Sequence, residues 1–226
     1  MKKTALALAA SLLFTGNFAY ALTEGTDYTV LKQTIPQTDN SKIEVLEFFS
    51  YSCIHCYNLD PILLKHSKSF ASDTYLRTEH VVWDNNMLNL ARIAAAVNSS
   101  NTKTQANPVI FNAMFEQKVN LADPKTFESW AARQNGFAPV LSAYHSLNNP
   151  VQARRMQDIT KQYAISATPL LIIGGKYQVK MHDLDSAMNT VDQLIAKVRT
   201  ERGMKAAAPR VLPKSIGGSL ANVANH

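Results

Sequence analysis

The chain has 226 residues, of which 46% are hydrophobic, and a formal net charge of +6. This length fits one large domain or one domain with an insertion. The basic excess is small and no cluster of Lys or Arg concentrates it, so the composition argues against a nucleic-acid-binding protein. After the N-terminal region, no stretch approaches the length of a membrane-spanning helix.

The N-terminus has the pattern of a bacterial signal peptide. Residues 1–3 are basic at two positions, residues 4–14 form a short apolar run, and residues 19–21 (AYA) have the small-x-small form of a cleavage site. The apolar run is too short for a membrane anchor, and no cysteine follows it for lipid attachment. We therefore predict a signal peptide at 1–21 and a mature chain that begins at Leu22.

Removal of the predicted signal peptide takes away Lys2 and Lys3 and no acidic residue, which leaves a net charge of +4. The expected destination is the periplasm. That compartment is oxidising, so a pair of cysteines there is exposed to disulfide chemistry.

The clearest predicted strand is 43–49 (IEVLEFF). Ile43 and Val45 point to one face and Leu46 and Phe48 to the other. Apolar residues on both faces indicate a central strand covered on two sides, as in α/β sheets.

The neighbouring segments predict a strand–helix–strand unit. A short strand is expected at 28–34, helical spacing runs over 53–64 with Pro61 as a kink or break, and a β-like pattern returns at 75–83. This order suggests a right-handed crossover, with the strand-to-helix turn at residue 53.

Residues 86 to about 164 have helical patterns and no strand signal. Several of the segments begin with proline, which is tolerated in the first helical turn. The expected helices cover 87–97, 108–119, 124–135, 139–147 and 150–163.

The β pattern returns near the C-terminus. Residues 169–173 and 176–179, separated by Gly-Gly, predict a hairpin, and a last helix is expected over 183–202. The predicted organisation is a signal peptide (1–21), the first part of an α/β domain (22–85), an inserted all-helical domain (86–164), the second part of the α/β domain (165–203) and a mobile tail (204–226).

Both cysteines of the chain lie at Cys53 and Cys56, directly after the predicted central strand. A zinc site needs four ligands and usually a second cysteine pair or paired histidines, which the sequence lacks. A c-type haem tether needs His after the second cysteine, but that residue is Tyr57. A structural disulfide would close a very small loop and stabilise little. A redox-active dithiol is therefore favoured over a structural bridge and over metal or copper handling.

Four further histidines stand alone in the sequence, and we expect each to be a surface or hydrogen-bonded residue. These are His66, His80, His145 and His182.

The position of Cys53 explains how a dithiol could be reactive. Near the first turn of a helix, free backbone N–H groups and the helix dipole favour an anion, here the thiolate. His55 could donate a hydrogen bond or a positive charge to that thiolate, or be an exposed ring without a role. Cys56, one turn further in, would be the less exposed, resolving thiol.

Glu47 is the one acidic residue on the strand face of Ile43 and Val45. If that face is buried, the pKa of the Glu47 carboxyl rises toward neutrality, which suits a proton acceptor for Cys56. The alternative is that this face opens to solvent at Glu47.

Thr168 and Pro169 open the predicted strand at 169–173. Proline lacks the N–H that a sheet ladder uses, so it belongs at a strand's first residue. If the peptide bond before Pro169 is cis, the backbone of Thr168 is placed to pair with an extended substrate strand.

A CxxC motif that opens a helix, followed more than 100 residues later by Thr-Pro before a strand, resembles the DsbA-type thiol:disulfide interchange proteins. The resemblance covers residues 24 to 202 and implies a thioredoxin fold interrupted by a helical domain. It implies Cys53 as nucleophile, Cys56 as resolving cysteine and His55 as thiolate stabiliser. It also implies Glu47 as buried acid and Pro169 as cis-proline.

Two positions differ from the commonest family pattern: Ile54 stands where Pro is usual, and Thr168 where the best-known members carry Val. The resemblance implies a dithiol oxidase of newly exported, unfolded proteins, reoxidised by a quinone-linked inner-membrane partner of the DsbB type. No metal or organic cofactor is implied, and no dimerisation segment is evident, so a monomer is expected. A reductase or isomerase on the same fold is the main alternative, and a non-catalytic copper- or client-binding protein is a further one.

Overall fold

The computed structural model of the protein describes residues 22–205. The predicted signal peptide, and the predicted tail from residue 206 onward, lie outside the described residues. The strands are β1 (Tyr28–Val30), β2 (Ile43–Phe49), β3 (Thr74–His80), β4 (Leu170–Ile173) and β5 (Tyr177–Val179). The helices are α1 (Ile54–Ser67), the 3-10 turn η1 (Asn85–Met87), α2 (Leu88–Ser99), α3 (Lys103–Phe115), α4 (Pro124–Ala131), α5 (Ala138–Tyr144), α6 (Asn149–Gln162) and α7 (Leu184–Glu201).

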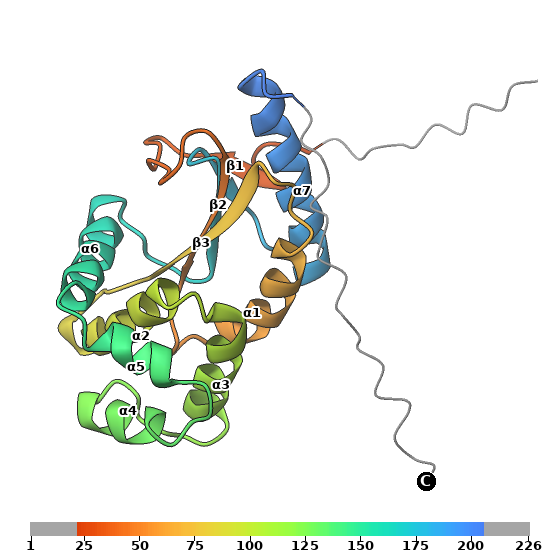
Figure 1. Ribbon diagram of the computed structural model, residues 1–226. Coiled ribbons are helices and arrows are strands. Elements are labelled where there is room, and N and C mark those ends of the chain that lie inside the picture. Colours follow the sequence, from red (N-terminus) through yellow and green to blue (C-terminus); the bar gives the residue numbers. More distant parts are fainter. Residues whose placement is uncertain (1–21, 206–226) are drawn as a thin grey trace, which may run out of the picture.

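The five strands form one mixed sheet in the order β1-β5-β4-β2-β3. β2 pairs with β3 in parallel and with β4 antiparallel, and β1 and β4 both pair antiparallel with β5. The parallel β2–β3 pair is joined through α1, as the strand–helix–strand pattern predicts. β3 and β1 are the two edges of the sheet (Figure 1).

β2 is buried along its whole length, which confirms the prediction of a central strand. On one face, Ile43 and Val45 join the core that α1 and α7 form with β4 and β5. On the other face, Leu46 and Phe48 pack in a smaller core with Ile172 and residues of the adjoining loops. The alternation of IEVLEFF therefore fills two cores at once.

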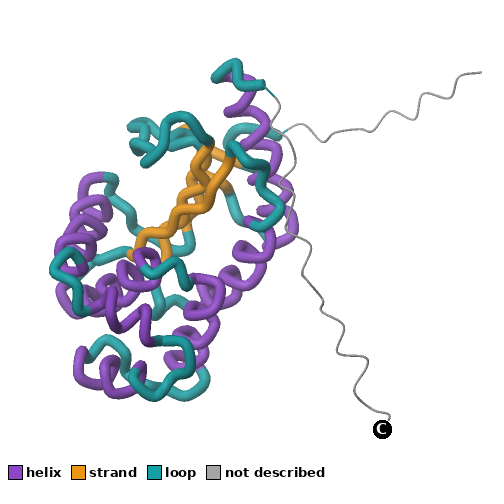
Figure 2. The backbone as a smooth tube through the Cα atoms, viewed as in Figure 1, coloured by secondary structure: helices purple, strands orange, loops and turns teal. Residues whose placement is uncertain are grey.

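Helices α2 to α6 follow β3 in succession and share an apolar core with Phe49 at the end of β2, Tyr51 and Cys56. α2 lies at the centre of this helical segment and contacts α3, α5 and α6. Figure 1 shows the segment at one end of the sheet, with α1 and α7 together along one side. Figure 2 shows the strands as one twisted band between these two groups of helices.

Proline interrupts the helices less than expected. Of the kink or break expected at Pro61, the break is absent. α1 continues to Ser67, because a proline removes only one helical hydrogen bond and buried Leu59 and Leu63 hold α1 against the sheet on both sides of it. The second helix of the helical segment begins at Lys103 and carries Pro108 inside it.

The other expected elements are present with shifted ends: β1 stops at Val30 and β3 at His80. No helix among residues 22–205 combines the length and the apolar character needed to cross a membrane.

The β4–β5 hairpin approaches the N-terminal loop so closely at Gly175 that only glycine fits. Gly175 has φ +72°, and a Cβ there would lie 2.1 Å from the carbonyl oxygen of Ile35. The same two residues are joined by a hydrogen bond from the Ile35 N–H to the Gly175 oxygen, 2.8 Å long.

We predict that Gly175→Ala lowers the free energy of unfolding by about 3 kcal/mol or more, because it adds a backbone clash to the strain of positive φ. Gly203→Ala is the matched control: Gly203 has φ +61° and open space around the added Cβ, so we expect a cost of about 1–2 kcal/mol. Urea unfolding of both variants checks this. Equal costs would contradict the close approach of the hairpin and the loop.

Candidate active site

Cys53 is the N-cap residue of α1, just beyond the end of β2. Its backbone is extended (φ −100°, ψ 116°), and its Sγ accepts the backbone N–H of Cys56 at 3.4 Å. Cys53 is half-buried and Cys56 fully buried, and neither forms a disulfide. The more accessible sulfur therefore lies at the positive end of the helix dipole.

The loop before β4 lies directly against Cys53. The Sγ–H of Cys53 donates to the carbonyl oxygen of Thr168 at 3.5 Å, a contact between residues 115 positions apart. The peptide bond between Thr168 and Pro169 is cis. The fold thus brings together the CxxC motif and the Thr168–Pro169 motif, and the backbone carbonyl of Thr168 faces the Cys53 sulfur.

A pocket of about 300 Å³ adjoins this contact. His55, Thr168 and Pro169 line one side, and residues of the β5–α7 connection, including His182 and Asp183, line the other. His55 is exposed, and no hydrogen bond joins its ring to Cys53 in the part of the chain that the structure describes. Ile54 is 46% exposed and offers an apolar surface beside the cysteine.

Glu47 is only 3% exposed, so the alternative of a solvent-open sheet face is wrong. Burial is the main cause that raises the pKa of its carboxyl to about 8, and the charge of Asp60 adds to the effect. The ammonium of Lys103 acts in the opposite direction. A carboxyl that titrates there can give and take a proton near neutral pH.

Burial also raises the pKa of the Cys56 thiol, with smaller contributions from Cys53 and from the charge of Glu47. A thiol of this kind stays protonated at neutral pH unless a base removes its proton or a disulfide holds its sulfur.

Two charged residues of this buried group were missed by the sequence reasoning. Asp60 has a pKa raised to about 6, mainly by burial, and Lys103 a pKa lowered to about 8 by burial. Asp60 Oδ1 accepts a 2.7 Å hydrogen bond from Asn107 of α3, whereas Oδ2 has no partner among the described residues. Residues four apart lie on the same face of a helix, so Asp60 lies on the same face of α1 as Cys56. An acidic residue on that face was the sequence pattern that could have identified Asp60.

The four lone histidines are surface or hydrogen-bonded residues, as expected. His80 is fully buried; its Nε2 accepts the N–H of Tyr51 and its Nδ1–H donates to the oxygen of Val81. Burial lowers the pKa of His80 to about 3. Among residues 22–205, no group of three or more His, Cys, Asp or Glu side chains is placed to hold a metal ion.

Comparisons with known proteins agree with this site. No family model matches the chain. Among curated proteins, the thiol:disulfide interchange protein DsbA of Bordetella parapertussis is 29% identical over 203 residues, which cover 87% of this chain and 97% of that protein.

Two solved structures are more similar. The oxidoreductase NmDsbA1 from Neisseria meningitidis is 48% identical with a TM-score of 0.78, and the match covers 80% of this chain and 96% of that one. The oxidoreductase NmDsbA3 from Neisseria meningitidis is 50% identical with a TM-score of 0.74, and the match covers 80% and 100%.

The mixed sheet, the helical insertion between β3 and β4, and the CxxC at the start of α1 define a thiol:disulfide oxidoreductase with a thioredoxin fold. At nearly half identity over the whole length of these relatives, the assignment can be made more specific. The chain belongs to the DsbA family of disulfide-introducing enzymes.

We predict that Glu47→Gln stabilises the protein in a pH-dependent way. The pKa of Glu47 is raised from 4.5 to about 8 in the folded chain, so its carboxyl costs no stability below about pH 4.5 and an increasing amount as the pH rises to 8. Urea unfolding should show no difference at pH 4 and a gain on the order of a few kcal/mol at pH 8.5. Glu116→Gln, at an exposed carboxyl, should change neither value. A gain for Glu47→Gln that is equal at both pH values would contradict a buried, ionisable Glu47.

Proposed function

We propose that the chain is a periplasmic dithiol oxidase that introduces disulfide bonds into unfolded, reduced exported proteins through a Cys53–Cys56 disulfide. The observation that carries the proposal is the placement of the Cys53 sulfur. It accepts an N–H at the start of α1 and lies 3.5 Å from the Thr168 carbonyl. A thiolate at that point would accept the Cys56 N–H and lie at the positive end of the helix dipole, whereas the Thr168 carbonyl pairs only with the protonated thiol. Stabilisation of the reduced form by the first two contributions would make the disulfide form a better oxidant.

The reaction begins when a substrate thiolate attacks the Cys53 sulfur of the oxidised enzyme. The Cys53–Cys56 bond breaks, a substrate–Cys53 disulfide forms, and Cys56 leaves as a thiolate. Because burial disfavours that thiolate, it needs a proton, and Glu47 is the proposed donor. The pKa of Glu47, about 8, means that it carries a proton at neutral pH.

A second substrate thiolate then attacks the substrate sulfur of the mixed disulfide. The substrate gains its disulfide, and Cys53 leaves as a thiolate beside the N-terminus of α1. The substrate has lost two electrons and two protons, and the enzyme holds the two electrons in its dithiol. On reoxidation, Glu47 would take the Cys56 proton back.

Substrate would be held by the loop before β4. We propose that an extended substrate segment pairs with the backbone of Thr168 and contacts Pro169 and the exposed side chain of Ile54. This arrangement would place a substrate sulfur next to Cys53. Because it would contact mainly the substrate backbone, it would depend little on the amino-acid sequence of the substrate, as expected for an enzyme that acts on many proteins.

We also propose the compartment of the enzyme, its redox partner and its oligomeric state. The signal-peptide pattern at 1–21 supports export to the periplasm. A quinone-linked inner-membrane oxidase of the DsbB type would reoxidise the cysteines, and the enzyme would act as a monomer without metal or organic cofactor. The support for these partners is membership of the DsbA family.

We predict that Cys53→Ser abolishes oxidation of a reduced, unfolded protein, because no sulfur is left for the substrate to attack. Cys56→Ser should also be inactive, because no Cys53–Cys56 disulfide can form to accept the electrons of the substrate. When it is given a disulfide-bonded protein instead, its Cys53 thiolate should attack that disulfide, and the mixed disulfide should persist because no Cys56 resolves it. Oxidation is followed by loss of free thiols and the mixed disulfide by non-reducing electrophoresis. Oxidase activity retained by Cys53→Ser would contradict the proposal.

A reductase or isomerase remains the second candidate, favoured by Thr168 and by Ile54, where the best-known oxidases carry other residues. The equilibrium constant with glutathione separates the two functions. For an oxidase, the equilibrium should lie toward the reduced enzyme and oxidised glutathione.

We predict that His55→Ser shifts this equilibrium about tenfold toward the oxidised enzyme. Within the described part of the chain no hydrogen bond joins the His55 ring to the Cys53 thiol, but that ring is the proposed donor to the Cys53 thiolate of the reduced enzyme. His145→Ser is the control, since His145 is an exposed residue of the helical segment. A wild-type equilibrium that already favours the oxidised enzyme would support the reductase instead.

A further inference from the structure

A second pocket, of about 320 Å³, lies beside β3, an edge strand of the sheet. Most of its walls come from β3, α2, α6 and the first residue of α3, so it lies between the sheet edge and the helical segment. It shares no residue with the pocket beside Cys53. The polar side chains that matter for its chemistry are those of Arg77, Thr78, Glu79, Asn98, Lys103 and Arg155.

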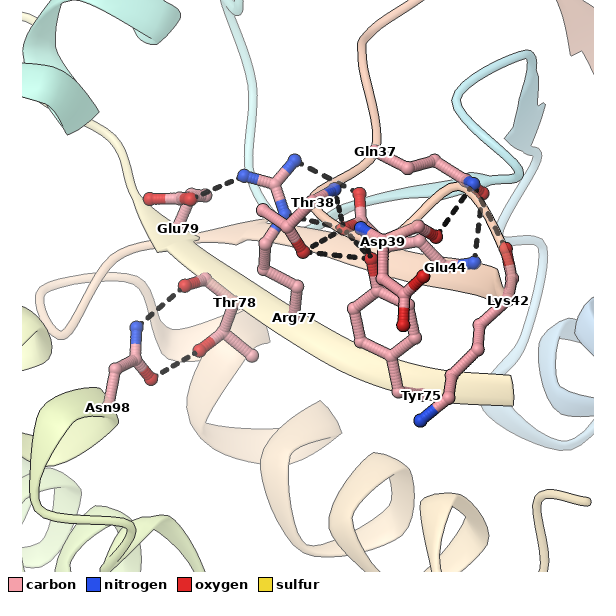
Figure 3. Close-up of polar contacts among 10 residues, drawn as sticks. All are labelled: Gln37, Thr38, Asp39, Lys42, Glu44, Tyr75, Arg77, Thr78, Glu79 and Asn98. Carbon is pink, nitrogen blue, oxygen red and sulfur yellow. Dashed lines mark hydrogen bonds and ion pairs between the residues drawn. The ribbon is translucent and has the colours of Figure 1, made fainter. Parts of the chain in front are cut away.

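The charges on the β3 wall are already paired. Arg77 donates from Nε and Nη2 to Glu44, at 2.9 and 3.0 Å, and from Nη1 to Glu79 at 2.5 Å. The hydroxyl of Tyr75 also donates to Glu44, at 2.6 Å. Figure 3 shows this cluster along the strand. Arg77 therefore has two carboxylate partners and needs no ligand.

The edge of β3 is also blocked to another strand. Asn98 of α2 donates to the carbonyl of Thr78 at 2.9 Å and accepts from its hydroxyl at 3.1 Å, as Figure 3 shows. A side chain that occupies a backbone group at the edge of a sheet opposes the pairing of a further strand there. The pocket suits a small molecule better than an extended peptide.

Two cations in the pocket lack a direct partner of this kind. The side chains of Lys103 and Arg155 form no ion pair or hydrogen bond with any residue between 22 and 205. The charges of Glu47, Asp60 and Glu79 attract Lys103 through space, and the charge of Glu79 attracts Arg155. Lys103 is also the first residue of α3, where the Thr102 side chain makes no capping hydrogen bond. The free N–H groups of that helix end add positive potential on the same side of the pocket.

We propose that this pocket binds a small molecule that carries a carboxylate or phosphate group, held by the guanidinium of Arg155 and the ammonium of Lys103. The planar guanidinium matches two oxygens of such a group, and the ammonium supplies a second point charge. The volume of the pocket leaves room for an organic body beyond the anionic group. The ligand would bridge β3 and the helical segment.

The test is a calorimetric titration of the mature chain from Leu22 with citrate and, separately, with inorganic phosphate. We expect saturable binding of at least one probe, and the stronger of the two identifies a carboxylate or a phosphate ligand. Arg155→Gln should weaken that binding about tenfold or more, because a charge-assisted hydrogen bond is lost. The matched control is Arg154→Gln, at an exposed arginine of the same helix that does not line the pocket; it should leave the affinity within about twofold.

Two results would overturn the proposal: no saturable binding of either probe, or an equal loss of affinity in Arg154→Gln and Arg155→Gln. The second result would mean that general charge attraction accounts for the binding. Because the readout is binding and not thiol oxidation, the outcome is independent of the proposed oxidase activity.

Discussion

The hydrogen bond from the Cys56 N–H to the Cys53 sulfur is the contact on which the site depends. It exists because β2 ends before Cys53 and α1 begins directly after it, so the sulfur caps a helix whose first N–H groups lack partners. The positive end of the helix dipole lies at that point. The remaining parts of the site either hold this turn in place or lie within reach of its sulfur.

The two cysteines differ because of what lies behind each of them. Cys53 faces the surface and the Thr168 carbonyl, whereas Cys56 faces a buried group that contains Glu47 and Asp60. Burial raises the pKa of Glu47 to about 8, so its carboxyl keeps its proton at neutral pH. In the proposed mechanism, substrate attacks the accessible sulfur of Cys53, and the buried sulfur of Cys56 needs a proton whenever its bond is broken.

The sequence predicted the parts of this site that depend on local pattern. The ends of β2 were predicted correctly because IEVLEFF is apolar on both faces and fills two cores. The CxxC and Thr168–Pro169 motifs were recognisable because each is defined by residue types at a fixed spacing. Lys103 was missed because only tertiary structure brings the start of α3 near Glu47. The start of α3 was itself placed too late, since the polar residues before Pro108 gave no apolar period to reveal a helix.

The helical segment contacts the surroundings of the dithiol, so it does more than cover the sheet. From α3, Asn107 accepts the hydroxyl of Tyr51 at 2.7 Å and donates to Asp60, so it joins the turn before Cys53 to the buried carboxyls. The loop that carries Thr168 is held instead from the α/β part of the chain, where the indole N–H of Trp83, between β3 and η1, donates to the oxygen of Ile165 at 2.6 Å. Displacement of the helical segment would therefore alter the buried carboxyls. A thioredoxin fold without the insertion would need other residues for that task.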